Sequence, residues 1–445
     1  MTAATPSIGA ARPTLRGRDL LALTVGIVVG AGIFRTPSLV AGAAGSEATL
    51  LIAWLAGGLL SIIGALCYAE LASAYPHIGG DYHFLRRAFG NRLAFLYAWA
   101  RLTVIQTGSL ALLAYVFGDY MAVLVPIGPL SSTVYAAAAV IVVSLLNWAG
   151  VRSGATAQRW LTAIEVGGLA LVIIAGLLIA PAGAVQPSVT GESALGLMMV
   201  FVLLTYGGWS EAAYLSAEVK DGARRIAPML VLGLTIVTLL YMLANLAFLS
   251  VLGLGGMAAT DAVAADVMRL AFGDTGGALM SLLIAIAAIT SANATAITGG
   301  RTACALGRSY RGLSWLGQWD DARNTPANGL LAQCVIALLL VGAGALAQDG
   351  FRTAIEYTAP VFWGFLLLVG LSLFVLRRRE PDRPRPFRVP FYPILPAVFC
   401  LTSAYLLYSS LAYTGWGALA GVAVLLGGGI LLTFLTPTDN EEFAS

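Results

Sequence analysis

The sequence predicts an all-α membrane protein with twelve transmembrane helices, ten of them arranged as two inverted five-helix repeats. The composition is 59% apolar and only 11% charged, with a mean hydropathy of +0.85. A soluble domain usually carries about twice that charged fraction. Apolar runs of about 20 residues, enough for a helix to span a bilayer, recur along the whole chain. Two of these runs, at corresponding positions of the two halves, are interrupted by glycines.

The apolar runs place the spans in order along the chain. They are expected at 19–44, 47–75, 91–122, 131–150, 158–180, 194–216, 228–253, 267–300, 327–347, 352–376, 391–411 and 414–436. Helices are expected because every backbone polar group in lipid must pair within its segment, and the runs are too long for barrel strands. We expect repeats over 19–180 and 194–376, two peripheral helices over 391–436, and tails at 1–18 and 437–445. A full span follows the basic N-terminal segment, so no removable signal peptide is expected.

Basic residues gather in alternate connecting segments. Twenty-one of the 25 lysines and arginines lie on one side of the predicted spans, and only Arg269 and Arg352 lie on the other. The positive-inside rule assigns the basic side, with both termini, to the cytoplasm. Since the charge pattern indicates membrane topology, no nucleic-acid binding is expected. The short loops suit a multi-pass protein of a bacterial inner (plasma) membrane.

The two glycine interruptions are the strongest functional signal. They lie in GIVVGAGIFRTP, residues 26–37, and in FVLLTYGGWSEAAY, residues 201–214. Each glycine weakens a helix by about 1 kcal/mol relative to alanine. Paired interruptions of this kind point to a transporter site, because unwound backbone offers N–H groups to a carboxylate and carbonyls to an ammonium group. A zwitterionic amino acid carries both groups. The alternative is that the glycines only permit close helix packing.

Around these interruptions the sequence resembles the amino acid–polyamine–organocation (APC) transporters, in particular the L-type amino acid transporter branch. GIVVGAGIFRTP is similar to the family's first-helix motif, G-[SA]-G-I-F. CYAELASAYPHIGGDYHFLRRAFG resembles the signature at the cytoplasmic end of the second helix, and YGGWSEAAYLSAEVKDGARRIAP resembles the sixth helix and the segment after it. The likeness covers residues 18–390 in order. It implies a leucine-transporter-type fold with helices 1 and 6 broken and two peripheral helices at the end.

The resemblance also implies an activity and a binding site. The activity is secondary active transport of amino acids by alternating access, through exchange or proton-coupled symport. N–H groups after the first break would meet the substrate carboxylate, and carbonyls at both breaks would meet its amino group. The residues so implied are Val28, Val29, Ala31, Gly32, Ile33, Thr205, Tyr206, Gly207 and Trp209. Small residues at the breaks favour neutral L-amino acids, and the alternative is a cationic amino acid or polyamine carrier. Core packing is the alternative role of Trp209.

Two charges within the spans depart from the branch. Its fifth helix typically carries a lysine where this chain has Glu165, and its third helix a glutamate where this chain has Arg101. By residue count both lie roughly 10–15 Å deep. We expect them to form an ion pair, because an unpaired charge at that depth costs several kcal/mol. The alternative is that Arg101 reaches the headgroups while Glu165 is protonated or hydrated.

Glu165 also bears on the coupling ion. An unpaired Glu165 would carry a proton or, less favoured, help to bind Na⁺ beside Thr290 and Ser291 of the eighth helix. A paired Glu165 would leave ion-independent exchange. H⁺ coupling or exchange is therefore preferred over Na⁺ coupling.

Two further charges are gate candidates. Arg35 begins the outer half of the first span, where Glu47 or Asp119 could be its partner. Glu211 lies on the inner half of the sixth span, where it would act as a gate, select a cationic group or serve a structural hydrogen bond.

The sequence argues against an enzyme and against bound cofactors. It has no metal-binding helix motif, no G-x-S-x-G motif and no loop long enough for a catalytic domain, so a membrane enzyme or receptor is the less favoured class. The four cysteines (Cys67, Cys304, Cys334 and Cys400) lack metal or disulfide spacing. None lies in an expected outer loop, so the disulfide-linked glycoprotein partner of many animal relatives is not expected.

Overall fold

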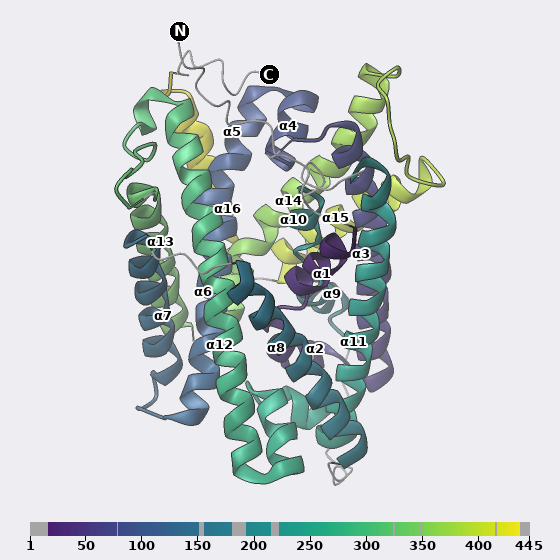
Figure 1. The fold of residues 1–445 in the computed structure, drawn as a ribbon, viewed down its shortest axis with the longest axis vertical. Helices are drawn as coiled ribbons and strands as arrows, with labels where there is room; N and C mark the ends of the chain where they lie inside the picture. The colour runs from purple at the N-terminus through teal and green to yellow at the C-terminus, as the bar shows by residue number, and fades with distance from the viewer. Residues whose placement is uncertain are drawn as a thin grey trace.

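A computed structural model describes residues 17–77, 79–150, 155–179, 193–214, 222–323, 325–347, 349–413 and 416–436. Within these ranges the regular elements are helices, with one isolated bridge between Asp320 and Thr325. The helices run mostly along the long axis of the molecule and form a single bundle (Figure 1). The all-α prediction is confirmed for this part of the chain.

The described residues form helices, most of which overlap the predicted spans. In chain order they are α1 (Gly17–Val28), η1 (Ala31–Phe34), α2 (Thr36–Ala43), α3 (Glu47–Ala74), α4 (Asp81–Phe89), α5 (Asn91–Ala100), η2 (Arg101–Ile105), α6 (Gln106–Leu124), α7 (Ser131–Trp148), α8 (Ala155–Ile174), η3 (Ala175–Ile179), α9 (Leu195–Thr205), α10 (Trp209–Tyr214), α11 (Gly222–Ala258), α12 (Val263–Ser309), η5 (Arg311–Leu313), α13 (Ala327–Leu346), α14 (Gly350–Arg379), α15 (Ile394–Tyr413) and α16 (Trp416–Leu432). Eight helices among the described residues are long and apolar enough to cross a membrane. Twelve crossings and an inverted repeat remain predictions.

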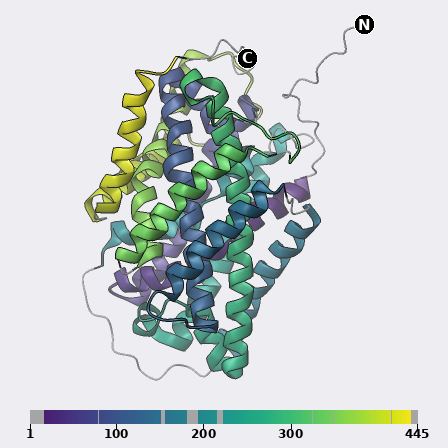
Figure 2. The ribbon, with the colours of Figure 1, turned by 90° about the vertical axis from the view of Figure 1, so that its left-hand side faces the viewer.

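Long helices frame the short segments of the two broken spans. α11 packs along α3 and α1, and α6 packs along α7 and α12. Trp54 of α3 and Tyr241 of α11 are fully buried where these helices meet, with ring centroids 5.6 Å apart. The short helix α2 contacts α9 and α11, and α10 contacts α1 and α3. The broken spans therefore lie inside the bundle, whereas α16 lies at its edge, beside α5 and α14 (Figure 2).

The third predicted span contains a π-helical turn that the sequence did not reveal. α5 and α6 form one rod through η2, whose five residues are π-helical. π-turns of this kind are frequent at functional sites. The carbonyl of Thr103 in this turn accepts hydrogen bonds from the hydroxyls of Thr107 (2.7 Å) and Tyr357 (2.9 Å). The turn thereby ties α6 to α14.

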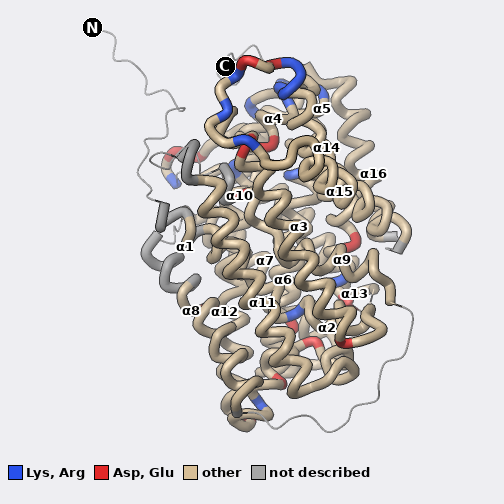
Figure 3. Tube along the Cα trace, turned by 90° about the vertical axis from the view of Figure 1, so that its right-hand side faces the viewer, with Lys and Arg blue, Asp and Glu red and all other residues tan. Residues whose placement is uncertain are grey.

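Arginine-rich segments gather at one end of the molecule, beyond α4 and α5 (Figure 3). The central contact there is made by Glu70, which is fully buried at the end of α3. It accepts hydrogen bonds from Arg377 at 2.7 and 2.5 Å and from the Val389 N–H at 2.7 Å. Arg385 lies 3.5 Å from the same carboxylate. Glu70 therefore joins α3 to α14 and to the chain that follows it.

The helix α4, at the same end, was not predicted as a separate element. Gly80 and Gly90 bound it with φ values of 47° and 91°, which favour glycine. Asp81 lies in its first turn, and Arg86 and Arg87 lie in its last turn. These charges complement the helix dipole. α4 packs against α5 and α14.

Candidate functional site

The first predicted break is confirmed. α1 ends at Val28, and Gly30 adopts an extended conformation with φ −113° and ψ −177°. The chain then forms the 3-10 turn η1 before α2 begins at Thr36. A Cβ built on Gly30 would find no atom within 4 Å, so this position faces open space. The first span is therefore interrupted at the position that the sequence predicts.

The second break is also confirmed. α9 ends at Thr205, and α10 begins at Trp209. Gly208 between them has φ +96°, a conformation that residues with a side chain rarely adopt. The intervening Tyr206 is fully buried, and its hydroxyl donates to the Trp54 carbonyl at 3.0 Å. This bond holds the turn against α3.

The two breaks lie against each other. A Cβ on Gly208 would lie 3.0 Å from the carbonyl oxygen of Ile27, in the last turn of α1. The hydroxyls of Thr205 and of Thr36, at the start of α2, are hydrogen-bonded to each other at 2.8 Å. The hydroxyl of Tyr241 lies 2.8 Å from the Val28 carbonyl and 3.4 Å from the Thr205 carbonyl. One tyrosine of α11 thus bonds the carboxyl ends of α1 and α9.

The residues predicted to bind substrate surround these breaks. Val28, Val29, Ala31 and Ile33 are buried, and Gly32 and Thr205 are half-buried. A Cβ on Gly32 would lie 3.6 Å from the Thr205 side chain, an ordinary contact distance. The structure therefore brings the helix-one residues and Thr205 together. Their binding of a substrate remains a prediction.

Trp209 has a packing role in the structure. Its ring lies edge-on to Tyr68, with centroids 5.1 Å apart, and 6.3 Å from the ring of Phe399. A Cβ on Gly64 of α3 would lie 2.7 Å from the Trp209 ring. These contacts fit the packing role that was the alternative considered from the sequence. Trp209 also lines a small cavity with Gly207 and Gly208, and its role in binding a substrate remains a prediction.

The expected Arg101–Glu165 ion pair is corrected by the structure. Arg101 instead pairs with Glu211 at 2.8 Å and donates to the Tyr97 hydroxyl at 3.1 Å. The break in the sixth span redirects α10, and this brings Glu211 to the π-turn that carries Arg101. Tyr97 in turn donates to Asp81 of α4 at 3.0 Å. A polar chain therefore runs from α10 to α4.

Glu165 lies elsewhere, on α8. Its side chain is 5% exposed and lies within electrostatic range of Tyr241. Thr290 of α12, a predicted partner in ion binding, donates to the Ile286 carbonyl of its own helix at 2.8 Å, and Ser291 is half-buried beside it. The described residues form no group of three His, Cys, Asp or Glu able to hold a metal.

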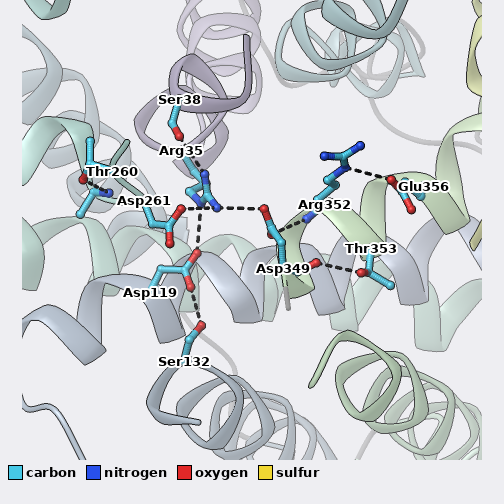
Figure 4. A network of polar contacts seen from close by, with 11 residues as sticks. Arg35, Ser38, Asp119, Ser132, Thr260, Asp261, Asp349, Arg352, Thr353 and Glu356 are labelled. Atoms are coloured by element: carbon cyan, nitrogen blue, oxygen red, sulfur yellow. Dashed lines mark hydrogen bonds and ion pairs between the residues drawn. The ribbon is translucent and has the colours of Figure 1, made fainter. Parts of the chain in front are cut away.

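Arg35 has the Asp119 partner that the sequence suggested, rather than Glu47, and two further carboxylates (Figure 4). Its guanidinium lies 3.2 Å from Asp119, 2.7 Å from Asp261 and 3.3 Å from Asp349. These residues come from α6, from the link between α11 and α12, and from the residue before α14. Sequence reasoning missed Asp261 and Asp349 because they lie in connecting segments, where aspartate is common. Tyr241 was missed because a buried tyrosine carries no signal in an apolar run.

These features define a class of protein: a helical membrane protein in which two broken helices meet inside a bundle. Comparison with known families gives the particular one. The chain belongs to the amino acid permease family of the APC superfamily, because the model of that family matches residues 15–427.

Named relatives agree with this assignment. The chain is 29% identical over 424 residues to the b(0,+)-type amino acid transporter 1 of Mus musculus, covering 92% of this chain and 85% of the relative. It is 28% identical over 431 residues to the same transporter of Homo sapiens, covering 93% and 86%. It is 29% identical over 422 residues to the large neutral amino acids transporter small subunit 2 of Homo sapiens, covering 91% and 77%.

Proposed function

We propose that this protein is a secondary transporter that moves amino acids across the plasma membrane by alternating access. The observation that carries the proposal is the direct contact between the two breaks, where Gly208 meets the Ile27 carbonyl. Backbone N–H groups after Gly30 would bind the substrate carboxylate, and carbonyls at the ends of α1 and α9 would bind its amino group. Alternating access would then move α1 and α10 against the frame of long helices.

Neutral L-amino acids are the proposed substrates. Glu211, the carboxylate that would favour a cationic side chain, is engaged by Arg101 at 2.8 Å. One relative's name specifies large neutral amino acids. The open space at Gly30 leaves room for a substrate side chain. The rival cationic amino acid or polyamine carrier is favoured by the buried carboxylate of Glu165, which would attract a cation.

Glu165 is the proposed coupling residue. A carboxyl group this deeply buried is costly in its charged form, so it is suited to bind and release a proton as solvent access changes. Proton-coupled symport is therefore proposed, with exchange as the alternative and Na⁺ coupling beside Thr290 and Ser291 disfavoured. No catalytic step is proposed.

Reconstitution into liposomes tests these proposals. We expect uptake of labelled leucine or alanine that arginine and putrescine do not block. An imposed inward H⁺ gradient should accelerate this uptake, and the acceleration should vanish in Glu165→Gln, whereas a Na⁺ gradient should have no effect. Absence of flux for every amino acid would refute the transport function. Selective inhibition by arginine or putrescine would favour the rival substrate class.

The proposed orientation places the arginine-rich end in the cytoplasm. We also propose that no disulfide-linked partner is needed, although the name of one relative describes a small subunit. Cys67, Cys304 and Cys400 are buried, and Cys334 is half-buried on α13. An unchanged band on a non-reducing gel, together with flux from the chain alone, would support this proposal. A mass shift that is lost on reduction would contradict it.

A further inference from the structure

Arg35 precedes α2 and is the centre of an ion-pair cluster (Figure 4). α2 lies in the half of the molecule away from the arginine-rich segments beyond α4 and α5 (Figure 3). The Arg35 side chain is only 3% exposed and lies within 3.3 Å of the carboxylates of Asp119, Asp261 and Asp349. It also donates to Ser38 at 3.2 Å and lies over the ring of Phe351. A buried guanidinium is costly unless it is paired, so each of these contacts stabilises it. The cluster joins four separate segments through one side chain.

The ion pair between Arg35 and Asp119 is buried and is supported by neighbouring hydrogen bonds. Asp119 is only 12% exposed and also accepts a hydrogen bond from Ser132 of α7. The next residue, Tyr120, donates to the Phe34 carbonyl at 2.8 Å. Two neighbouring residues of α6 therefore bond two neighbouring residues of the first span. Separating these elements would break both bonds and leave Asp119 buried without its cation.

The carboxylates of Asp261 and Asp349, which also contact Arg35, are more exposed to solvent than that of Asp119. Asp261 is 71% exposed, in the short link between α11 and α12, and Asp349 is 31% exposed, before α14. Water can solvate both carboxylates once the guanidinium leaves. A cavity of about 380 Å³ borders them, lined also by Phe201 and Leu197 of α9. Movement of these two segments would widen that cavity toward the breaks.

We propose that the Arg35 cluster is a latch, in which the ion pair with Asp119 is permanent and the ion pairs with Asp261 and Asp349 can break. Arg35 keeps Asp119 throughout the transport cycle and releases Asp261 and Asp349 when the cavity opens to the outside. The link before α12 and the start of α14 are then the parts that move, while α2 and α6 stay together. This inference rests on the proposed transport function and on the proposed orientation.

Cysteine labelling tests the latch without relying on transport. Phe201 lines the cavity and is 2% exposed, so a cysteine placed there reports opening. The background is the full chain with its four cysteines replaced, carrying Phe201→Cys, in proteoliposomes treated from outside with a membrane-impermeant maleimide. Asp261→Asn and Asp349→Asn should each raise the labelling rate three- to tenfold, and Asp349→Glu should restore it.

Glu356→Gln is the matched control, because it removes a carboxylate that pairs with Arg352 at 3.0 Å near the same cavity and does not touch Arg35. It should leave the labelling rate unchanged.

Asp119→Asn should instead lower the thermal stability. Equal labelling in Asp261→Asn and the parent would overturn the proposal, and the exposure of Asp261 makes this variant informative even if Asp349→Asn fails to fold. Faster labelling without amino acid flux would support the latch and refute the transport function. Amino acid flux with unchanged labelling would support the transport function and refute the latch.

Discussion

Two glycines at the breaks occupy opposite environments. Gly30 faces open space in an extended conformation that any residue adopts, whereas Gly208 has φ +96° and lies against the Ile27 carbonyl. The first glycine thus leaves room beside the candidate site, and the second permits the contact that forms it. The same residue type therefore serves two purposes within one site.

Alanine substitutions should separate these purposes. Gly30→Ala should fold with stability within about 1 kcal/mol of the parent, yet slow the uptake of leucine more than that of alanine, because the added methyl group enters the open space. Gly208→Ala should lose folding stability, because its methyl group would lie 3.0 Å from a carbonyl oxygen. Thermal unfolding and uptake of both substrates check this prediction. Equal loss of leucine and alanine uptake in Gly30→Ala would contradict it.

The Arg101–Glu211 pair gives a second prediction at this scale. Arg101→Gln or Glu211→Gln alone removes one of the two opposite charges that lie 2.8 Å apart. The double reversal, Arg101→Glu with Glu211→Arg, restores opposite charges. We therefore expect expression and uptake to be higher in the double variant than in Arg101→Glu alone. The matching combination of Arg101→Glu with Glu165→Lys should give no such rescue, and rescue there would favour the pairing first expected from the sequence.

Glu70 and Glu380 provide a matched comparison between elements. Both pair with an arginine at the arginine-rich end, but Glu70 is fully buried against Arg377, whereas Glu380 and Arg87 form a half-exposed pair. Glu70→Gln should cost about 3–5 kcal/mol, because it leaves a largely enclosed guanidinium without its partner. Glu380→Gln should cost less than about 1 kcal/mol. Unfolding in detergent measures both, and similar losses would show that burial does not set the strength of these pairs.

The segment between α3 and α5 should make the fold sensitive to acid. His77 and His83 stack with ring centroids 4.3 Å apart. Burial, with the nearby charges of His77, Arg86, Arg87 and Arg383, lowers the pKa of His83 to about 4. Because the unfolded chain binds this proton near pH 6.5, stability is complete above that pH and falls as the pH drops toward 4.

The expected loss for this histidine is of the order of 1 kcal/mol, since His83 is partly exposed and water screens the effect. His83→Gln should flatten the fall in unfolding midpoint between pH 6.5 and pH 4.5. Part of the fall will remain, because burial also lowers the pKa of His77. An identical pH profile in the parent and in His83→Gln would rule out this role.

At the scale of the whole molecule, the sequence predicted what depends on local pattern. Hydropathy located most of the long helices but not α4, and the glycine pairs that include Gly30 and Gly208 located the breaks. Contacts between distant segments could not be read in this way. Arg101 pairs with Glu211 because α10 changes direction after the break. Asp261 contacts Arg35 because the bundle places the α11–α12 link beside the first span. A single sequence carries no signal for such pairings, since any carboxylate at similar depth is an equal candidate.

The assembled site makes a final prediction about ligands. If N–H groups of one broken helix bind a carboxylate while carbonyls of both bind an ammonium group, only a molecule with both groups bridges the two halves. Leucine at 100 times its Kd should then stabilise the purified protein by about 2.7 kcal/mol. Leucinamide and isoamylamine, which keep the side chain and amino group but lack the carboxylate, should raise the unfolding midpoint far less at the same concentration. Glutamate should also have little effect, because burying its second carboxylate without a paired cation would be costly. Equal stabilisation by leucine and isoamylamine would mean that the broken first helix does not bind the carboxylate.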